Sequence, residues 1–113
     1  MDRITGLRKE IDEINIQILN LLSKRAEIAI QIGYQQTIKG LPHYDPVREE
    51  EMLTLLEQHN LGPFPTSTIQ KIFKEIFKAS LSLEETQDRK QLLISRKVQP
   101  QDTVVKVGDL SLG

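Results

Sequence analysis

The sequence places arginines among apolar residues that would otherwise form the interior of a helical protein. Arg25 stands where a further apolar residue is expected between Leu21 and Ile28. A guanidinium stays charged in proteins and is costly to bury alone, so this position calls for an anionic partner. Arg8 flanks the same stripe, and Arg48 opens a shorter apolar segment. Because the planar guanidinium matches a carboxylate bidentately, the surplus of arginines favours a small molecule with more than one carboxylate.

A structural alternative comes from polar residues late in the chain. Ser80 and Glu84 continue an apolar stripe, and a buried Arg25–Glu84 ion pair that fixes helix register explains part of the pattern equally well. His43 and His59 have no metal-ligand spacing between them, and we expect both to be solvated surface histidines. We see no Ser-His-Asp arrangement and no Gly-rich phosphate loop. The sequence therefore predicts neither a metal nor a cofactor.

Helices are needed to position these residues. Apolar residues in the first third of the chain recur at steps of three and four, as on one stripe of a helix: Ile4, Leu7, Ile11, Ile14, Ile18, Leu21, Ile28 and Ile32. A helix over about residues 3–38 would be ~54 Å long, whereas a compact monomer of this size is only ~30–35 Å across. The helix needs a partner chain to cover it, so we predict a homodimer.

Proline and glycine divide the rest of the chain. The pair Asp45-Pro46 predicts the N-cap and first residue of a second helix that runs to about His59. A third helix is expected from residue 66 or 67 and should fray after Asp88. Residues 102–113 alternate loosely and predict a weak β-hairpin. We therefore divide the chain into a helical domain over residues 1–88 and a linker, with a short extended tail, over residues 89–113.

Composition excludes several classes of protein. The 113 residues include 15 Lys and Arg against 16 Asp and Glu, and a net charge of -1 gives no electrostatic case for binding nucleic acid or an anionic membrane. The absence of cysteine rules out disulfides, thiolate zinc sites and a cysteine nucleophile. No apolar run approaches the ~18 residues of a membrane span, and the N-terminus does not read as a signal peptide. We expect a cytoplasmic protein.

Five segments together resemble the AroQ class of chorismate mutases over about residues 4–87. They are Leu7-Arg8-Lys9-Glu10-Ile11-Asp12, Leu21-Leu22-Ser23-Lys24-Arg25, Ile32-Gly33, Asp45-Pro46-Val47-Arg48-Glu49 and Ser80 to Glu84. The resemblance implies an all-α, three-helix subunit in an intertwined homodimer, in which the long first helix contributes to both active sites.

The end of the chain carries a second resemblance. Residues 92–97 and 100–103 are similar to the segment that leads into the barrel of DAHP (deoxy-arabino-heptulosonate phosphate) synthase in Bacillus-type fusion enzymes. This similarity implies a DAHP synthase domain in the full-length protein.

The AroQ resemblance also implies an activity. The family rearranges chorismate to prephenate in the shikimate pathway of aromatic amino acid biosynthesis, an isomerase reaction that needs no nucleophile, metal or cofactor. Catalysis comes from holding the substrate dianion in its compact form and stabilising negative charge on the breaking ether oxygen. Carried over by position, Arg25 would clamp one carboxylate and Arg8, from the other subunit, the second. Arg48 would support the pocket, and Ser80 would line its carboxylate side.

The remaining roles include two departures from the family pattern. Glu49 and the backbone near Asp45 would hold the substrate hydroxyl. Gln36 stands where most members have a lysine that donates to the ether oxygen, and losing one charged donor typically costs ~3–4 kcal/mol. Glu84 replaces a second donor that is commonly glutamine, and an ionised carboxylate can only accept. Lys39, one turn beyond Gln36, is a candidate substitute.

Three functions remain open from the sequence, and we predict the first of them because the fold and most of the pocket residues agree with the family. The first is a slow chorismate mutase whose activity rises as the pH falls toward the pKa of Glu84. The second is a weakly active or inactive regulatory module that binds chorismate or prephenate and controls an attached DAHP synthase by feedback. The retained arginines and altered donors favour this binding role. The third is a helical dimerisation element without a ligand, in which Arg25 pairs with Glu84.

Overall fold

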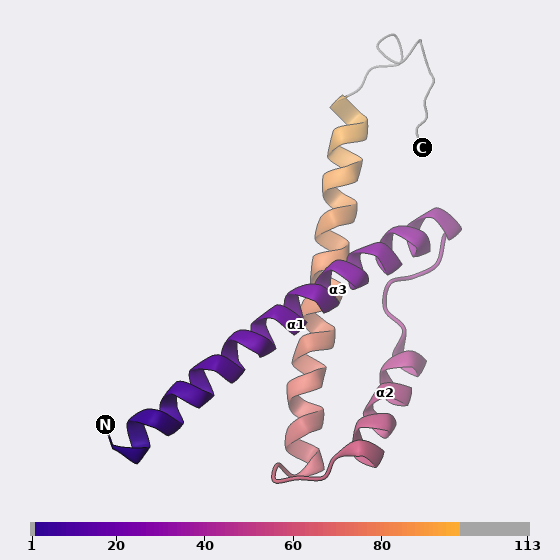
Figure 1. The fold of residues 1–113 in the computed structure, drawn as a ribbon. Helices are drawn as coiled ribbons and strands as arrows, with labels where there is room; N and C mark the ends of the chain where they lie inside the picture. Colours follow the sequence, from indigo (N-terminus) through magenta and orange to yellow (C-terminus); the bar gives the residue numbers. More distant parts are fainter. Residues whose placement is uncertain (1, 98–113) are drawn as a thin grey trace.

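The computed structural model describes residues 2–97, which form three helices joined by two short connections (Figure 1). α1 spans Arg3–Lys39, α2 spans Pro46–His59 and α3 spans Thr66–Lys97. The prediction of an all-α, three-helix subunit with a long first helix is confirmed. The hairpin expected over residues 102–113 lies outside the described residues. None of the three helices is both long enough and apolar enough to cross a membrane.

Capping interactions set the ends of α1 and α2. The Asp2 carboxylate accepts a hydrogen bond from the backbone N–H of Thr5 at 2.7 Å. The Asp45 carboxylate does the same for the N–H of Arg48 at 3.0 Å. Each bond satisfies a donor that the start of a helix leaves free. α1 ends at Gly40, whose φ of 68° is a left-handed conformation that a residue with a Cβ rarely adopts.

α3 is longer than the sequence indicated. We expected this helix to fray after Asp88, and that expectation was wrong because α3 continues to Lys97. Residues 66–99 contain neither proline nor glycine, so nothing in this stretch removes a helical hydrogen bond or loosens the backbone. The division into a helical domain over residues 1–88 and a linker over residues 89–113 stays a prediction.

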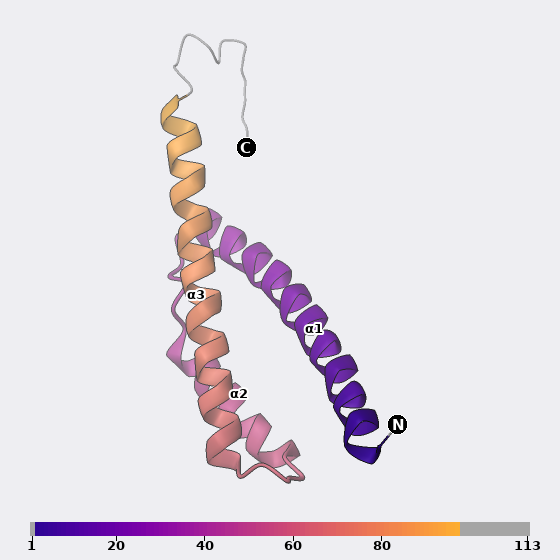
Figure 2. The same ribbon diagram turned by 90° about the vertical axis from the view of Figure 1, so that its left-hand side faces the viewer.

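α3 is the element that both other helices contact. α1 crosses α3 obliquely, and α2 lies along the N-terminal part of α3 (Figures 1 and 2). The N-terminal half of α1 leads away from the other two helices in both views. The C-terminal part of α1, the start of α2 and the middle of α3 are therefore the parts that can build a shared site.

The crossing of α1 over α3 is close because α1 carries a glycine there. Gly33 is buried, and a Cβ added to it would lie 2.9 Å from Cγ and 3.2 Å from Cβ of Glu84. The missing side chain thus makes room for Glu84. It also fixes where the Glu84 carboxyl stands relative to α1.

One chain buries little apolar surface. Among the described residues, the buried apolar side chains are Ala29, Leu53 and Phe77. The apolar stripe of α1 is exposed instead, with Ile4 60% and Leu21 68% accessible. The radius of gyration is 20.4 Å, against about 13 Å expected for a compact chain of this length. Within a single chain the stripe has no cover, which is the situation that led us to predict a dimer.

Gly33→Ala tests the close crossing. Alanine is the better helix former by about 1 kcal/mol, but at this position the added methyl group meets Glu84, and such overpacking costs about 1–3 kcal/mol. We expect Gly33→Ala to lower the free energy of unfolding, measured by urea denaturation at a fixed chain concentration. Gly6→Ala is the matched control in the same helix, because nothing lies within 4 Å of a Cβ added there. An equal gain in stability at both positions would contradict the close crossing.

Candidate active site

A cavity of about 510 Å³ lies where α1, α3 and the start of α2 meet. Polar residues that the sequence singled out contribute to its lining: Arg25, Gln36, Asp45, Arg48, Glu49, Ser80 and Glu84. Apolar side chains from all three helices line it as well: Ile28, Ala29, Ile32, Met52, Phe77 and Leu81. Arg25 and Glu84 are partly buried against this apolar wall, where water screens their charges less than at an open surface. Asp45 and Arg48 are exposed.

Arg25 is held in place by α3. Its Nη1 donates a hydrogen bond to Oγ of Ser80 at 2.7 Å, and the Ser80 hydroxyl in turn donates to the carbonyl oxygen of Ile76 at 2.9 Å. The guanidinium carbon lies 5.5 Å from the centre of the Phe77 ring, which is within cation–π range. The Arg25–Glu84 ion pair considered from the sequence is not formed in the described part of the chain. The guanidinium is oriented by uncharged groups, so its charge remains available to an anion in the cavity.

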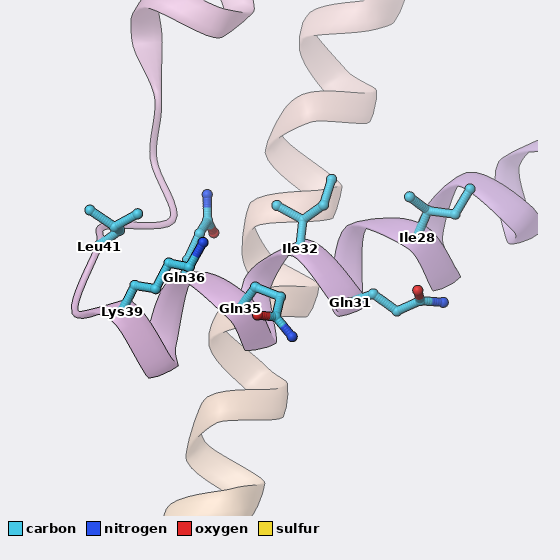
Figure 3. A pocket seen from close by; sticks show the side chains of 7 residues that line it. All are labelled: Ile28, Gln31, Ile32, Gln35, Gln36, Lys39 and Leu41. Carbon is cyan, nitrogen blue, oxygen red and sulfur yellow. The ribbon is translucent and has the colours of Figure 1, made fainter.

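Gln36 and Glu84 form the other end of the cavity. Gln36 follows Gly33 by one turn on α1, and Figure 3 shows its side chain in line with Ile28 and Ile32. The Glu84 side chain is only 10% exposed. Burial raises the pKa of Glu84 above its ordinary value, and the positive charges of His43 and Arg25 oppose that rise. The carboxyl therefore keeps its proton, and can donate a hydrogen bond, to a higher pH than an exposed glutamate.

His43 is part of this end of the cavity, so the expectation of a solvated histidine was wrong. Its side chain is 12% exposed. Nδ1 lies 2.9 Å from Oε1 of Gln36 and 3.7 Å from Oε1 of Glu84, while Nε2 is hydrogen-bonded to Oδ2 of Asp88. The short connection between α1 and α2 turns His43 back onto α3, which buries it. His59 is exposed, as expected.

Asp88 anchors the histidine from the opposite side. The Thr37 hydroxyl also donates to Oδ1 of Asp88 at 3.0 Å. The hydrogen bond from His43 lowers the pKa of Asp88, and the bond from Thr37 adds to this effect. Sequence reasoning missed both His43 and Asp88. A signal was available for the second, because Asp88 follows Glu84 by one turn and so lies on the same face of the helix.

Two other candidates lie away from this cavity. Arg8 is exposed on α1, seventeen positions before Arg25, which corresponds to about 26 Å along the helix axis. Lys39 lines a neighbouring hollow of about 350 Å³ along α1 (Figure 3), which shares Ile28, Ile32 and Gln36 with the larger cavity. Lys39 itself does not line the cavity that contains Glu84.

The chemistry of the cavity follows from its two ends. The guanidinium of Arg25 can bind a carboxylate. At the other end, an amide and a carboxyl of raised pKa can donate hydrogen bonds to an oxygen that becomes negative. Within residues 2–97, no three His, Cys, Asp or Glu side chains are grouped so as to hold a metal ion.

Asp88→Asn tests the His43–Asp88 interaction. Asp88 binds a proton less readily in the folded chain than in the unfolded one. Its contribution to the free energy of unfolding is therefore present above its ordinary pKa of 3.8 and is lost as the pH falls through the lower folded value. We expect the wild type to be more stable than Asp88→Asn near neutral pH, with the difference shrinking below pH 3.8, in urea titrations over a pH series. Glu85→Gln, which removes an exposed neighbouring carboxylate, is the control. A difference that does not change with pH would exclude the ionised carboxylate as its source.

Comparison with known proteins identifies relatives for most of this chain. The profile of chorismate mutase type II matches residues 7–85. The bifunctional chorismate mutase/prephenate dehydratase of Aquifex aeolicus is 40% identical over 89 residues, which cover 75% of this chain and 25% of that protein. The chorismate mutase of Methanocaldococcus jannaschii is 32% identical over 95 residues, covering 79% of this chain and 96% of that protein.

A solved structure agrees in fold as well as in sequence. The chorismate mutase (Form II) of Thermus thermophilus superimposes with a TM-score of 0.74 at 62% identity, over 74% of this chain and 96% of that chain. The present chain spans 21–25% of the length of these bifunctional relatives. The profile match takes in nearly all of α1, the whole of α2 and α3 as far as Glu85. This chain belongs to the chorismate mutase type II family.

Proposed function

We propose that this chain is a chorismate mutase, an isomerase that rearranges chorismate to prephenate. The observation that carries the proposal is the cavity between α1 and α3. It combines an arginine that has no carboxylate partner among the described residues with two potential hydrogen-bond donors, Gln36 and Glu84. Family membership supports the same reaction.

The reaction requires the protein to position the substrate and to stabilise developing charge, and it does not require a nucleophile. Arg25 holds one substrate carboxylate, and its bond to Ser80 orients the guanidinium before the substrate arrives, so less orientational freedom is lost on binding. As the ether bond breaks, negative charge grows on its oxygen. The amide of Gln36 and the protonated carboxyl of Glu84 stabilise that charge, because they donate more strongly as the oxygen becomes more negative.

The other end of the substrate is assigned to residues of α2 and of a second chain. Glu49 and the backbone near Asp45 hold the hydroxyl, and Arg48 supports the mouth of the cavity. The second carboxylate is bound by Arg8 of the partner subunit, since Arg8 of the same chain is far along α1 from Arg25. The exposed apolar stripe of α1 supports a homodimer of this kind, in which one chain covers the other.

Some expectations from the sequence stay predictions. Bifunctional relatives contain their mutase segment within a longer protein, and the two reported above are named for a chorismate mutase, one of them fused to a prephenate dehydratase. The attached DAHP synthase domain and the cytoplasmic location are therefore predictions.

The purified chain is expected to convert chorismate to prephenate faster, in kcat/KM, at pH 5 than at pH 7.5. The reason is that Glu84 donates only while it carries its proton, which is below its raised pKa. The side chain of Glu84→Gln donates at any pH, so this substitution should flatten the pH profile.

Arg25→Ala should lower kcat/KM by about 100-fold or more, because it removes a charged hydrogen-bond donor. Chorismate that binds in calorimetry without being turned over would instead support the regulatory module.

A mixing experiment tests whether Arg8 acts across the dimer. Arg8→Ala and Arg25→Ala chains should each be nearly inactive. Unfolded together in urea and refolded, they form mixed dimers in which one site carries both substitutions and the other carries neither. With a two-fold dimer, mixing should restore about a quarter of wild-type activity. If Arg8 served the site of its own chain, every site in a mixed dimer would carry one substitution and no activity would return.

A further inference from the structure

We infer that His43 is a positioning residue for this reaction, which directs the NH2 group of Gln36 into the cavity and supplies a positive charge beside Glu84. The inference rests on the proposed mutase function. It arises from the contacts of a buried histidine that neither the arginine pattern nor the proposed mechanism uses.

The hydrogens of the ring follow from its two partners. Nε2 faces the Asp88 carboxylate, which when ionised only accepts, so Nε2 carries a hydrogen. Nδ1 lies 2.9 Å from Oε1 of Gln36, and an amide oxygen also only accepts, so Nδ1 carries a hydrogen as well. An imidazole that donates from both nitrogens is a cation. The geometry therefore places an imidazolium at this end of the cavity.

The orientation of Gln36 follows from that bond. When His43 holds Oε1, the NH2 group is left on the other side of the amide and is free to donate to a substrate oxygen. A neutral His43 that keeps its hydrogen on Nε2 would present Nδ1 as an acceptor. It would then attract the NH2 group and turn the amide oxygen toward the substrate, where an oxygen of growing negative charge is repelled.

The positive charge of His43 makes a second contribution to the reaction. Gln36 is neutral, and so is Glu84 when it donates, so His43 is the cation in contact with this pair. Its charge stabilises the oxygen that becomes negative, while the same charge favours loss of the proton from Glu84. From α3, the carboxylates of Glu84 and Asp88 face the ring; from α1, the uncharged Thr37 has its Oγ1 3.5 Å from Nε2. Charged groups of the connection and of α2 line the same cavity: Asp45, Arg48 and Glu49.

A pH profile reports on the proton of Glu84, whose pKa is raised by burial, and so does not isolate His43. Replacing His43 by an amide residue, asparagine or glutamine, does isolate the contribution of each ring nitrogen. Asparagine keeps a donor in place of Nδ1, toward Gln36, and glutamine keeps one in place of Nε2, toward Asp88. The two variants therefore preserve opposite contacts of the same ring while both remove its charge.

The kinetic test compares these variants at pH 7. His43→Gln should lower kcat by about 10- to 100-fold with little change in KM, because Gln36 loses the bond that directs its donor. His43→Asn should retain several-fold more kcat than His43→Gln. In a Gln36→Lys background, His43→Gln should have little effect, because an ammonium group donates in every orientation. His59→Gln is the control for a histidine outside the cavity and should leave kcat unchanged.

Two outcomes would overturn the inference. Equal losses for His43→Gln and His43→Asn would mean that the contact with Gln36 is irrelevant. An undiminished loss for His43→Gln in the Gln36→Lys background would mean that His43 supports the fold rather than the donor.

A second measurement does not depend on turnover. Nitrogen-15 NMR of the unliganded chain distinguishes an imidazolium from each neutral tautomer, and His59→Gln assigns the two histidines. Hydrogens on both nitrogens of His43 are expected, and a His43 that lacks one on Nδ1 would overturn the inference.

The outcomes separate the inference from the proposed function. If the wild type fails to turn over chorismate, the proposed function fails, and the spectrum still decides what His43 presents to Gln36. If the wild type is active and His43→Gln is equally active, only the inference fails.

Discussion

The site depends on one close contact between two helices. At Gly33 the backbone of α1 approaches α3 so closely that a single methyl group would meet the side chain of Glu84. The same approach sets the neighbouring turns of α3, because residues four apart share a face of a helix. Ser80 reaches Arg25 on one side of the crossing, and Asp88 reaches the end of α1 on the other. One glycine thus sets the distances of both ends of the cavity at once.

The two ends of the cavity differ in kind. Arg25 carries a charge that no accessible pH removes, and its contacts with Ser80 and Phe77 hold it without neutralising it. At the other end, the charge of Glu84 depends on pH, and burial raises the pKa of that carboxyl. An anion in the cavity would therefore meet one fixed cation and one carboxyl that responds to pH. This difference concentrates the pH sensitivity of the cavity at the end formed by Gln36 and Glu84.

The sequence predicted the helices better than it predicted the contacts between them. Apolar spacing, together with the Asp45-Pro46 start, located α1 and α2 to within about a residue, because both signals act over one or two turns. Arg25 was identified because it interrupts a stripe. His43 was missed because a loop residue has no periodicity, and its burial depends on where the loop lies against α3. The length of α3 was underestimated, although residues 66–99 contain no proline or glycine that would break a helix.

A single chain has almost no buried core, and this affects the fraction of the protein that is folded. Burying one large apolar side chain contributes about 1.5–3 kcal/mol, whereas ordering the backbone costs about 1–2 kcal/mol for each residue. Ala29, Leu53 and Phe77 cannot offset that cost for a 37-residue helix and its two neighbours. The remaining burial has to come from another surface, and with a second copy folding becomes bimolecular. Dilution would then unfold this protein at constant temperature, and its cellular abundance would set the folded fraction as well as the amount of catalyst.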